Sequence, residues 1–326
     1  MSELRYHPFL GQWVTTATHR QDRTFHPPDD YCPLCPTKPG GFPTEIPLES
    51  YDIVVFENKF PSFRTPAAEE SVPATAFLPV RPSDGVCEVV CYTDQHDSSF
   101  AALPIHQVDK LCRVWQDRYI QLSSRPEVEY VFIFENKGKE IGVTLSHPHG
   151  QIYGYPFVPP IPARELQMER EHHLAHDSLL MEKWLELELS EGKRVIFENE
   201  RFAAVLPFFA RYPFEVHVAP KRHLRSLKNF EEPDLDGLAE ALLMVARKYD
   251  LLFGFSLPYI MAMHQEPAVL GYEFNWFHVE FTPLHRTAEK LKHLAGSESA
   301  AGAFINDTLP EDTAKILREI HVDPLR

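Results

Sequence analysis

The chain has 326 residues, of which 44% are hydrophobic and 24% charged, and its formal net charge is −15. This is the composition of a folded globular protein with one large or two smaller domains, and the negative charge argues against a general nucleic-acid-binding protein. No apolar run approaches the ~20 residues of a membrane span, and the N-terminus lacks an apolar signal region, so we expect a cytoplasmic protein with reduced cysteines.

A polar stretch near the N-terminus contains two arginines three residues apart, Arg20 and Arg23. Their planar guanidinium groups can present forked donors to a phosphate group. Two arginines in a polar loop are also compatible with an ordinary solvated surface. The residues alone leave both interpretations open.

The next feature is the pair Cys32 and Cys35, which is followed by a proline-rich loop. Two cysteines at this spacing can form a redox pair or half of a zinc site. A redox pair usually opens a helix after a strand, and the prolines argue against that. The zinc interpretation needs two remote ligands, and His96 and His147 are the natural candidates, giving a closed set of two cysteines and two histidines.

The rest of the chain alternates strands and helices. Short apolar runs predict strands at 51–61, 86–93 and 128–134, the first of which ends in a polar turn containing Asn58. A helix is predicted over 104–124 by apolar residues at helical spacing, namely Val108, Leu111, Cys112, Trp115, Tyr119 and Ile120. A long helix is expected over 162–189, closing before Gly192, and a short one over 311–320.

The most specific feature is the run Ser146-His147-Pro148-His149-Gly150-Gln151. In an extended backbone, residues two apart point to the same face, so His147, His149 and Gln151 would share one side of a strand. Gly150 has no Cβ and lets a ligand approach the backbone closely. An imidazole beside an amide donor can attack phosphorus while the amide holds the phosphoryl oxygens. A pair of structural strand histidines is the alternative.

This run resembles the active-site motif of the galactose-1-phosphate uridylyltransferase family, a branch of the histidine-triad superfamily. The resemblance implies that His149 is the nucleophile, that a covalent uridylyl-histidine forms, and that Gln151 steadies the uridylyl group. It implies structural zinc on Cys32, Cys35, His96 and His147. It also implies a set of substrate-binding residues, which at the matching positions are Arg20, Arg23, Asn58, Asn136, Gly142, Thr144, Gln151 and Lys292.

The second half of the sequence repeats the first. Segments at 195–202, 216–223, 233–252, 259–265 and 277–281 match segments at 54–60, 90–96, 104–124, 130–136 and 146–150 in the same order. Five ordered matches indicate a duplication. With the family resemblance, they predict an α+β fold of two histidine-triad-like halves, each a mostly antiparallel sheet with packed helices. We place the halves at 1–190, which carries the nucleophile, and 191–326, whose site is degenerate.

The second half has Glu280 where the first has His149, so it cannot perform the same chemistry. The family often binds iron or zinc through one glutamate and three histidines. The matching residues here are Glu165, His264, His278 and Glu280, the last of which replaces a histidine. Carboxylate and imidazole ligands allow zinc, iron or manganese. The alternative is that Glu280 is an exposed strand residue and the second site holds no metal.

The resemblance, which covers nearly the whole chain, implies a hexose-1-phosphate uridylyltransferase that converts UDP-glucose and galactose 1-phosphate to glucose 1-phosphate and UDP-galactose by ping-pong transfer. The resemblance also suggests a homodimer, with residues near Lys292 reaching the sugar phosphate. One alternative is a nucleotidyltransferase or phosphorylase of the same scaffold, acting on an ADP-hexose or a dinucleotide. Another is a non-catalytic metal-binding or nucleotide-sensing protein, which would form no covalent adduct with UDP-glucose.

Overall fold

A computed structural model describes the backbone of residues 2–23 and 31–325, and the side chains of the same ranges except residues 22 and 23. The side chain of Arg23, a predicted phosphate ligand, therefore falls outside the described residues. Within these ranges nine strands form an antiparallel main sheet in the order β3 (Val54–Glu57), β5 (Val86–Cys91), β7 (His149–Tyr155), β6 (Tyr130–Lys137), β11 (Tyr259–His264), β12 (His278–Pro283), β10 (Val216–Pro220), β9 (Phe202–Val205) and β8 (Val195–Glu198).

The order of these strands is symmetric about the pairing of β6 with β11. Moving outward, β7, β5 and β3 follow on one side, while β12, β10 and β9 follow on the other. This confirms the predicted α+β fold with two equivalent halves and an antiparallel sheet. The match of 54–60 with 195–202 is wrong by about one strand, because β9 takes the place equivalent to β3 and β8 is an additional edge strand.

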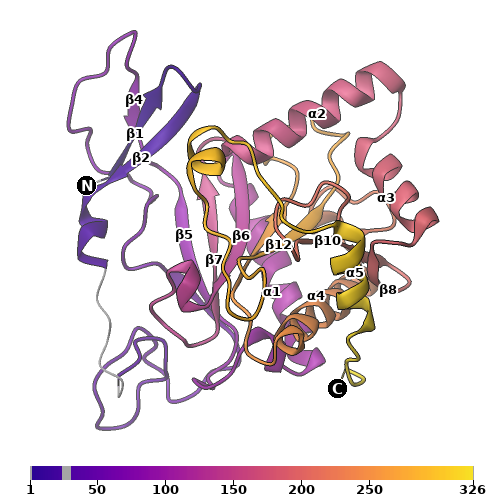
Figure 1. Ribbon diagram of the computed structural model, residues 1–326. Coiled ribbons are helices and arrows are strands. Elements are labelled where there is room, and N and C mark those ends of the chain that lie inside the picture. The colour runs from indigo at the N-terminus through magenta and orange to yellow at the C-terminus, as the bar shows by residue number, and fades with distance from the viewer. Residues whose placement is uncertain (1, 24–30, 326) are drawn as a thin grey trace.

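Helices cover both faces of the second half of the sheet. Alternate residues of β9 point to opposite faces, so Phe202 and Ala204 pack in the largest core cluster while Ala203 and Val205 pack with Leu185 in another. The larger cluster lies under two helices that pack against each other (Figure 1), α1 (Ile105–Ser123) and α4 (Glu232–Leu252). The remaining helices are α2 (Pro160–His176), α3 (Leu180–Glu191) and α5 (Pro310–Glu319).

The helix predicted over 104–124 is confirmed as α1. It buries Val108, Leu111, Cys112, Trp115 and Tyr119 as the spacing predicts. Ile120 is 41% exposed, and Leu122 occupies the buried position near the end of the helix. The periodicity therefore placed the apolar stripe correctly except at its last turn.

The single long helix predicted over 162–189 is wrong, because the chain forms α2 and α3 with a break between them. Asp177 adopts a left-handed backbone with φ of 50°, which ends α2. Aspartate tolerates this conformation better than most residues. The ring of His172 contacts Ser178 Oγ at 3.0 Å across the break. The predicted end before Gly192 is confirmed, since Gly192 caps α3 with φ of 63°.

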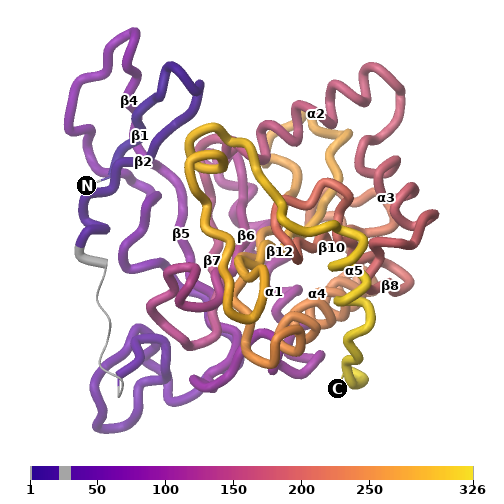
Figure 2. The backbone as a smooth tube through the Cα atoms, viewed as in Figure 1, coloured from indigo at the N-terminus to yellow at the C-terminus, as the bar shows by residue number. Residues whose placement is uncertain are grey.

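The first and last parts of the chain lie outside the main sheet. A separate three-stranded sheet in the order β2 (Gln12–Ala17), β1 (Ser2–His7) and β4 (Val80–Pro82) stands at the left of Figure 1, beside the first half. After β12 the C-terminal segment, yellow in Figure 2, passes in front of the central strands before α5. No helix in the described ranges is long and apolar enough to cross a membrane.

Gly150 is the point on β7 where the sheet leaves no room for a side chain. A Cβ there would lie 2.1 Å from the hydroxyl oxygen of Tyr92 and 3.0 Å from the carbonyl oxygen of Phe134. Tyr92 is fully buried against Phe100 and Trp115, so it cannot easily move away. The glycine of the motif is thus required by packing, whatever its role toward a ligand.

We expect Gly150→Ala to lower the free energy of unfolding by ~1–3 kcal/mol, the usual cost of overpacking a dense core. Gly296→Ala is the matched control, because a Cβ at Gly296 meets nothing within 4 Å. Denaturant unfolding of both variants measures the difference. Equal free energies of unfolding for the two variants would contradict this expectation, because they would show that Tyr92 can move aside without destabilising the fold.

Candidate functional site

His149 opens β7 and is fixed by a hydrogen bond to the backbone. Its Nδ1 lies 2.7 Å from the carbonyl oxygen of His147, which can only accept, so Nδ1 carries the hydrogen. Nε2 then holds the free lone pair. Burial lowers the pKa of His149, and the bond to His147 opposes this only in part. The ring is therefore a neutral imidazole near neutral pH, with one nitrogen available as a nucleophile.

Most of the predicted substrate residues surround a single cavity of about 960 Å3. Its wall includes the side chain of His149 and six of the predicted binding residues, namely Arg20, Asn58, Asn136, Gly142, Thr144 and Gln151. They come from five separate parts of the chain. Gly142 has φ of 86°, a left-handed conformation that favours glycine and turns the loop toward the cavity.

The amide of Gln151 is oriented by two neighbours. Its Oε1 accepts hydrogen bonds from Asn58 Nδ2 at 3.4 Å and from the hydroxyl of Tyr153 at 3.2 Å. With the oxygen held this way, the Nε2 group is left to donate into the cavity. Gln151 and His149 are two apart on β7 and line the same cavity, as their spacing predicts.

A second cavity of about 680 Å3 is also lined by His149. It shares Asn136, Thr144 and His149 with the first, and it adds residues of the second half, among them Pro258 and His285. An in-line displacement places the nucleophile and the leaving group on opposite sides of the phosphorus. A substrate that reacts with His149 must therefore fit in the space that His149 borders, and both cavities border it.

Lys292 is not brought to either cavity of its own chain. It is 4% exposed, and its ammonium group bonds Glu298 Oε1 at 3.0 Å and the carbonyl oxygen of Ile305. These contacts hold the C-terminal segment together. The side chain of Arg23 is not among the described residues, whereas Arg20 contacts the hydroxyl of Ser62.

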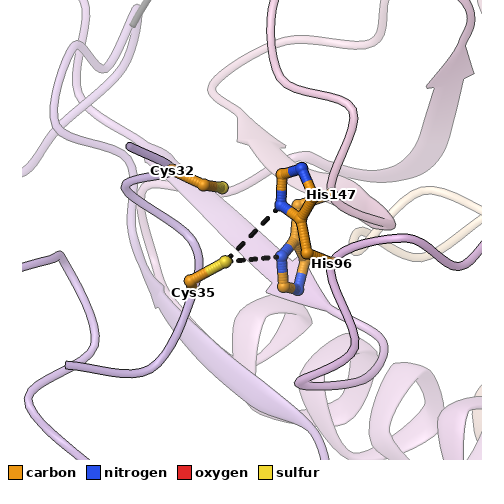
Figure 3. A group of neighbouring side chains, drawn as sticks. All are labelled: Cys32, Cys35, His96 and His147. Carbon is orange, nitrogen blue, oxygen red and sulfur yellow. Dashed lines mark hydrogen bonds between the residues drawn. The ribbon is translucent and has the colours of Figure 1, made fainter. Parts of the chain in front are cut away.

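The predicted zinc ligands form a compact group (Figure 3). Ligand atoms of Cys32, Cys35, His96 and His147 all lie within 4.8 Å of one another. Cys35 Sγ lies 3.5 Å from His96 Nδ1 and 3.6 Å from His147 Nδ1. Burial, with the neighbouring Cys32, raises the pKa of the Cys35 thiol to about 11. A bound cation would reverse this shift by favouring the thiolate.

The outer contacts of His147 prepare it as a ligand. Its Nε2 lies 2.8 Å from the carbonyl oxygen of Thr93 and 2.7 Å from the hydroxyl of Tyr51. Because the carbonyl only accepts, Nε2 carries the hydrogen and Nδ1 keeps its lone pair for a metal. Two thiols and two such imidazoles fit zinc. Sequence reasoning missed Tyr51 and Thr93, because nothing in their local sequence marks them.

The predicted second metal ligands separate into two overlapping groups. Glu165, His264 and His278 form one, while His278 and Glu280 form another with His217. Glu280 is buried, not exposed, and its carboxylate bonds Arg211 Nη2 at 2.5 Å and faces His217 Nε2 at 3.2 Å. Sequence reasoning missed both: His217 is brought to Glu280 by the pairing of β10 with β12, and Arg211 reaches it from the segment before β10.

These buried charges perturb one another. Burial opposes a charge on His264, but the carboxylates of Glu165 and Glu280 outweigh it and raise its pKa to about 9. His278 moves in the other direction, to a pKa of about 4, because burial and the neighbouring His264 disfavour its charge. Glu169 is buried beside Glu165, and both effects raise its pKa to about 8.

Glu135 is a further buried carboxyl group, at the wall of the second cavity. Burial raises its pKa to about 8, although the charge of Lys137 opposes the shift. The ammonium group of Lys137 is itself paired with Asp250 at 2.6 Å. Glu135 Oε2 has no hydrogen-bond partner among the described residues. The carboxyl group is therefore held largely neutral at neutral pH.

Comparison with known proteins points to one family. Residues 1–159 match the family model described as galactose-1-phosphate uridyl transferase, N-terminal domain, and residues 165–324 match the C-terminal domain of the same enzyme. A galactose-1-phosphate uridylyltransferase of Thermotoga maritima is 40% identical over 99% of this chain and 100% of its own. One of Streptomyces lividans is 39% identical over 98% of this chain and 87% of its own.

Solved structures agree in fold. A structure titled as that of uridylyltransferase has a TM-score of 0.87 and 34% identity, covering 97% of both chains. An ADP-glucose phosphorylase from Arabidopsis thaliana has a TM-score of 0.74 at 22% identity, covering 99% of each. The second similarity is one of fold alone.

The raised pKa of Glu135 predicts a pH-dependent stability. Between the ordinary carboxyl pKa and about 8, the folded protein holds a proton that the unfolded chain has released. The free energy of unfolding therefore falls as pH rises through this window. Glu135→Gln removes this contribution, so its stability should fall less than that of the unaltered protein between about pH 5 and about pH 9.

Urea unfolding across this pH range measures the effect. Glu200→Gln, at a side chain that is 86% exposed, serves as the control and should follow the unaltered protein. Parallel pH profiles for Glu135→Gln and the unaltered protein would contradict the assignment.

Proposed function

This chain belongs to the galactose-1-phosphate uridylyltransferase family, and we propose that its reaction runs through a covalent uridylyl group on His149. The substrates are UDP-glucose and galactose 1-phosphate, and the products are glucose 1-phosphate and UDP-galactose. The observation that carries the proposal is the hydrogen bond from His149 Nδ1 to the carbonyl of His147, which leaves Nε2 free where two cavities meet.

In the first step, the Nε2 lone pair of His149 attacks the α-phosphorus of UDP-glucose. A nitrogen–phosphorus bond forms, and the bond from that phosphorus to the bridging oxygen breaks. The electron pair leaves with glucose 1-phosphate. A phosphate monoester has its second pKa near ~6, so the departing oxygen needs no general acid. Galactose 1-phosphate then attacks the same phosphorus and restores the free imidazole, which gives ping-pong kinetics.

The neighbouring polar groups hold the phosphates during both steps. We assign the larger cavity to the nucleotide, with Arg20, Asn136 and Thr144 on the diphosphate and Asn58 and Gly142 beside them. Arg23 joins Arg20 by resemblance to the family. Gln151 donates its amide to a phosphoryl oxygen, since its carbonyl oxygen is already occupied by Asn58 and Tyr153.

We propose zinc on Cys32, Cys35, His96 and His147 as a structural ion. The backbone carbonyl of His147 orients His149. An ion bound to the ring of His147 would therefore hold this carbonyl, and with it His149, in place. No metal needs to touch the phosphates in this mechanism. A second ion, zinc or iron, is proposed near Glu165, His264 and His278, whose ligand atoms lie close together.

We also propose a cytoplasmic homodimer. All five cysteines are free thiols, as a reducing compartment requires. The homodimer rests on the resemblance to the family, in which residues near Lys292 reach the sugar phosphate of the neighbouring subunit. We place the boundary between the halves at 190/191, at the last residue of α3, while the family models divide the chain near the start of α2.

The related alternative is a phosphorylase acting on an ADP-hexose or a dinucleotide. It would use the same His149 chemistry with inorganic phosphate as acceptor. Relatives at 40% and 39% identity are uridylyltransferases, whereas the ADP-glucose phosphorylase shares only the fold. Turnover of UDP-glucose with galactose 1-phosphate, compared with ADP-glucose and phosphate, separates the two reactions.

We expect UDP-glucose to add one uridylyl group to the protein, and His149→Ala to abolish this adduct by removing the attacking nitrogen. Intact-protein mass spectrometry after rapid mixing measures it. His176→Ala, at an exposed histidine of α2, is the control and should form the adduct normally. An adduct of equal yield in His149→Ala would place the nucleophile elsewhere.

Removal of the structural zinc should lower the melting temperature, because metal binding and folding are coupled. A strong chelator should destabilise the unaltered protein and Cys112→Ala, whose thiol lies in α1 away from the ligands. The Cys35→Ser variant should already lack one equivalent of zinc, so the chelator should not lower its melting temperature further through this site. Thermal melts and elemental analysis measure both effects, and a full zinc equivalent in Cys35→Ser would contradict the site.

A further inference from the structure

A small cavity lies between α2 and the ends of β11 and β12. Its volume is about 10 Å3, close to the space that one water molecule or ion occupies. Two carboxyl groups and two imidazoles line it, from Glu165, Glu169, His264 and His278. Both histidines are buried, and each comes from an end of its strand. Ligand atoms of Glu165, His264 and His278 lie within 4.8 Å of one another, and Glu169 borders the same cavity just outside that group. Nitrogen and oxygen ligands of this kind suit a transition-metal ion.

Glu280, the ligand that the sequence suggested, faces the wrong nitrogen of His264. Glu165 Oε2 lies 2.6 Å from His264 Nδ1, whereas Glu280 Oε2 lies 3.9 Å from His264 Nε2. An imidazole binds one ion through one nitrogen. An ion bound by Glu165 and by Nδ1 of His264 therefore cannot also be bound by Glu280, which faces the other nitrogen. His278 Nε2 lies 3.9 Å from Glu280, so this imidazole could bind an ion on either side of His264.

The carboxylate of Glu280 is also committed elsewhere. Its two oxygens meet Arg211 Nη2 at 2.5 Å and His217 Nε2 at 3.2 Å. Glu215 contacts the same two groups, at 3.2 Å from Arg211 and 2.9 Å from His217. Two carboxylates and two cationic groups form a closed ion-pair cluster. Withdrawing Glu280 to a metal would leave Arg211 with one anionic partner fewer in a largely buried place.

Glu169 has the opposite character. It lies one helical turn after Glu165 on α2, so both side chains point to the same side of the helix. It is 6% exposed, and its Oε2 has no hydrogen-bond partner among the described residues. A buried carboxylate oxygen without a partner is costly, and a cation in the adjacent cavity would satisfy it.

His278 is prepared as a ligand in the same way as His147. Its Nδ1 lies 3.3 Å from the carbonyl oxygen of Trp276, which only accepts, so the hydrogen is on Nδ1 and Nε2 keeps its lone pair. His264 is placed by the pairing of β11 with β12, which sets it directly opposite His278. Two imidazoles and Glu165 thus stand ready around the cavity, with Glu169 as the unpaired fourth group.

We propose that Glu169 is the fourth ligand of a divalent transition-metal ion held by Glu165, His264 and His278, and that Glu280 is not a ligand but the anionic partner of Arg211 and His217. This inference rests on the second ion of the proposed function, not on the uridylyl chemistry. Glu169 replaces Glu280 as the fourth ligand, and Glu169 lies four positions after Glu165 on α2.

Metal content and affinity test the proposal. The full-length protein is loaded with Zn2+, freed of excess ion, and analysed for zinc per chain, with the cysteine-histidine site as an internal reference. The unaltered protein and Glu280→Gln should hold two equivalents, and Glu169→Gln should hold one. By calorimetry, the second site of Glu169→Gln should bind Zn2+ on the order of 100-fold more weakly.

Co2+ gives a second readout, because its visible spectrum reports the ligand set directly. Glu169→Gln should change the spectrum of the second site, and Glu280→Gln should leave it unchanged. If Glu280→Gln does not fold because Arg211 is left unpaired, the double variant Arg211→Gln with Glu280→Gln removes both charges together and should still hold two equivalents.

Two results would overturn the proposal. Loss of the second equivalent in Glu280→Gln or the double variant, with retention in Glu169→Gln, would make Glu280 the ligand. A single equivalent in the unaltered protein at every Zn2+ concentration would mean that the cavity binds no such ion. The uridylyl adduct on His149, measured on the same samples, reports separately on the proposed reaction.

Discussion

The hydrogen bond from His149 Nδ1 to the backbone carbonyl of His147 is the interaction on which the rest of the site depends. It selects the tautomer, leaves Nε2 free on a residue that lines two cavities, and works only if the backbone of His147 is held still. The side chain of His147 is buried among Cys35, His96, Tyr51 and Thr93, so the proposed zinc cluster and the proposed nucleophile are linked through this one residue. The side chain of His147 lies in the cysteine-histidine cluster, and its backbone carbonyl orients His149.

The surrounding sheet keeps this arrangement in register. β7 lies between β5 and β6, and Tyr92 at the end of β5 fills the space that only a glycine at position 150 leaves open. Gly150 therefore fixes how closely the start of β7 approaches its neighbours. Gln151, the next residue, takes its orientation from Asn58 and Tyr153. Neighbouring residues of the motif thus have different packing partners in the sheet.

Much of the site could be predicted because its residues lie in short, distinctive patterns. The motif around His149, the paired cysteines, and the repeated order of strands and helices all have signatures that survive without coordinates. Arg211 and His217 could not be found this way, since the pairing of β10 with β12 brings His217 to Glu280 and the fold of the preceding segment brings Arg211 there. Glu169 was one of many charged residues on a helix that was predicted too long. The break at Asp177 and the internal contacts of Lys292 depend on tertiary packing that local patterns do not encode.

Equivalent strands of the two halves hold buried histidines in different electrostatic surroundings. β7 and β12 are equivalent strands, and near the start of each stands a ring whose Nδ1 bonds the carbonyl two residues earlier, His149 in one and His278 in the other. Burial lowers the pKa of both rings and keeps them neutral. In the first half His149 lines two cavities large enough for a substrate. In the second half Glu165 and Glu169 of α2 line a small cavity together with His278. Because Glu280 stands at the position that matches His149, the second half has no imidazole there, and its buried histidines meet the carboxyl groups of α2 instead.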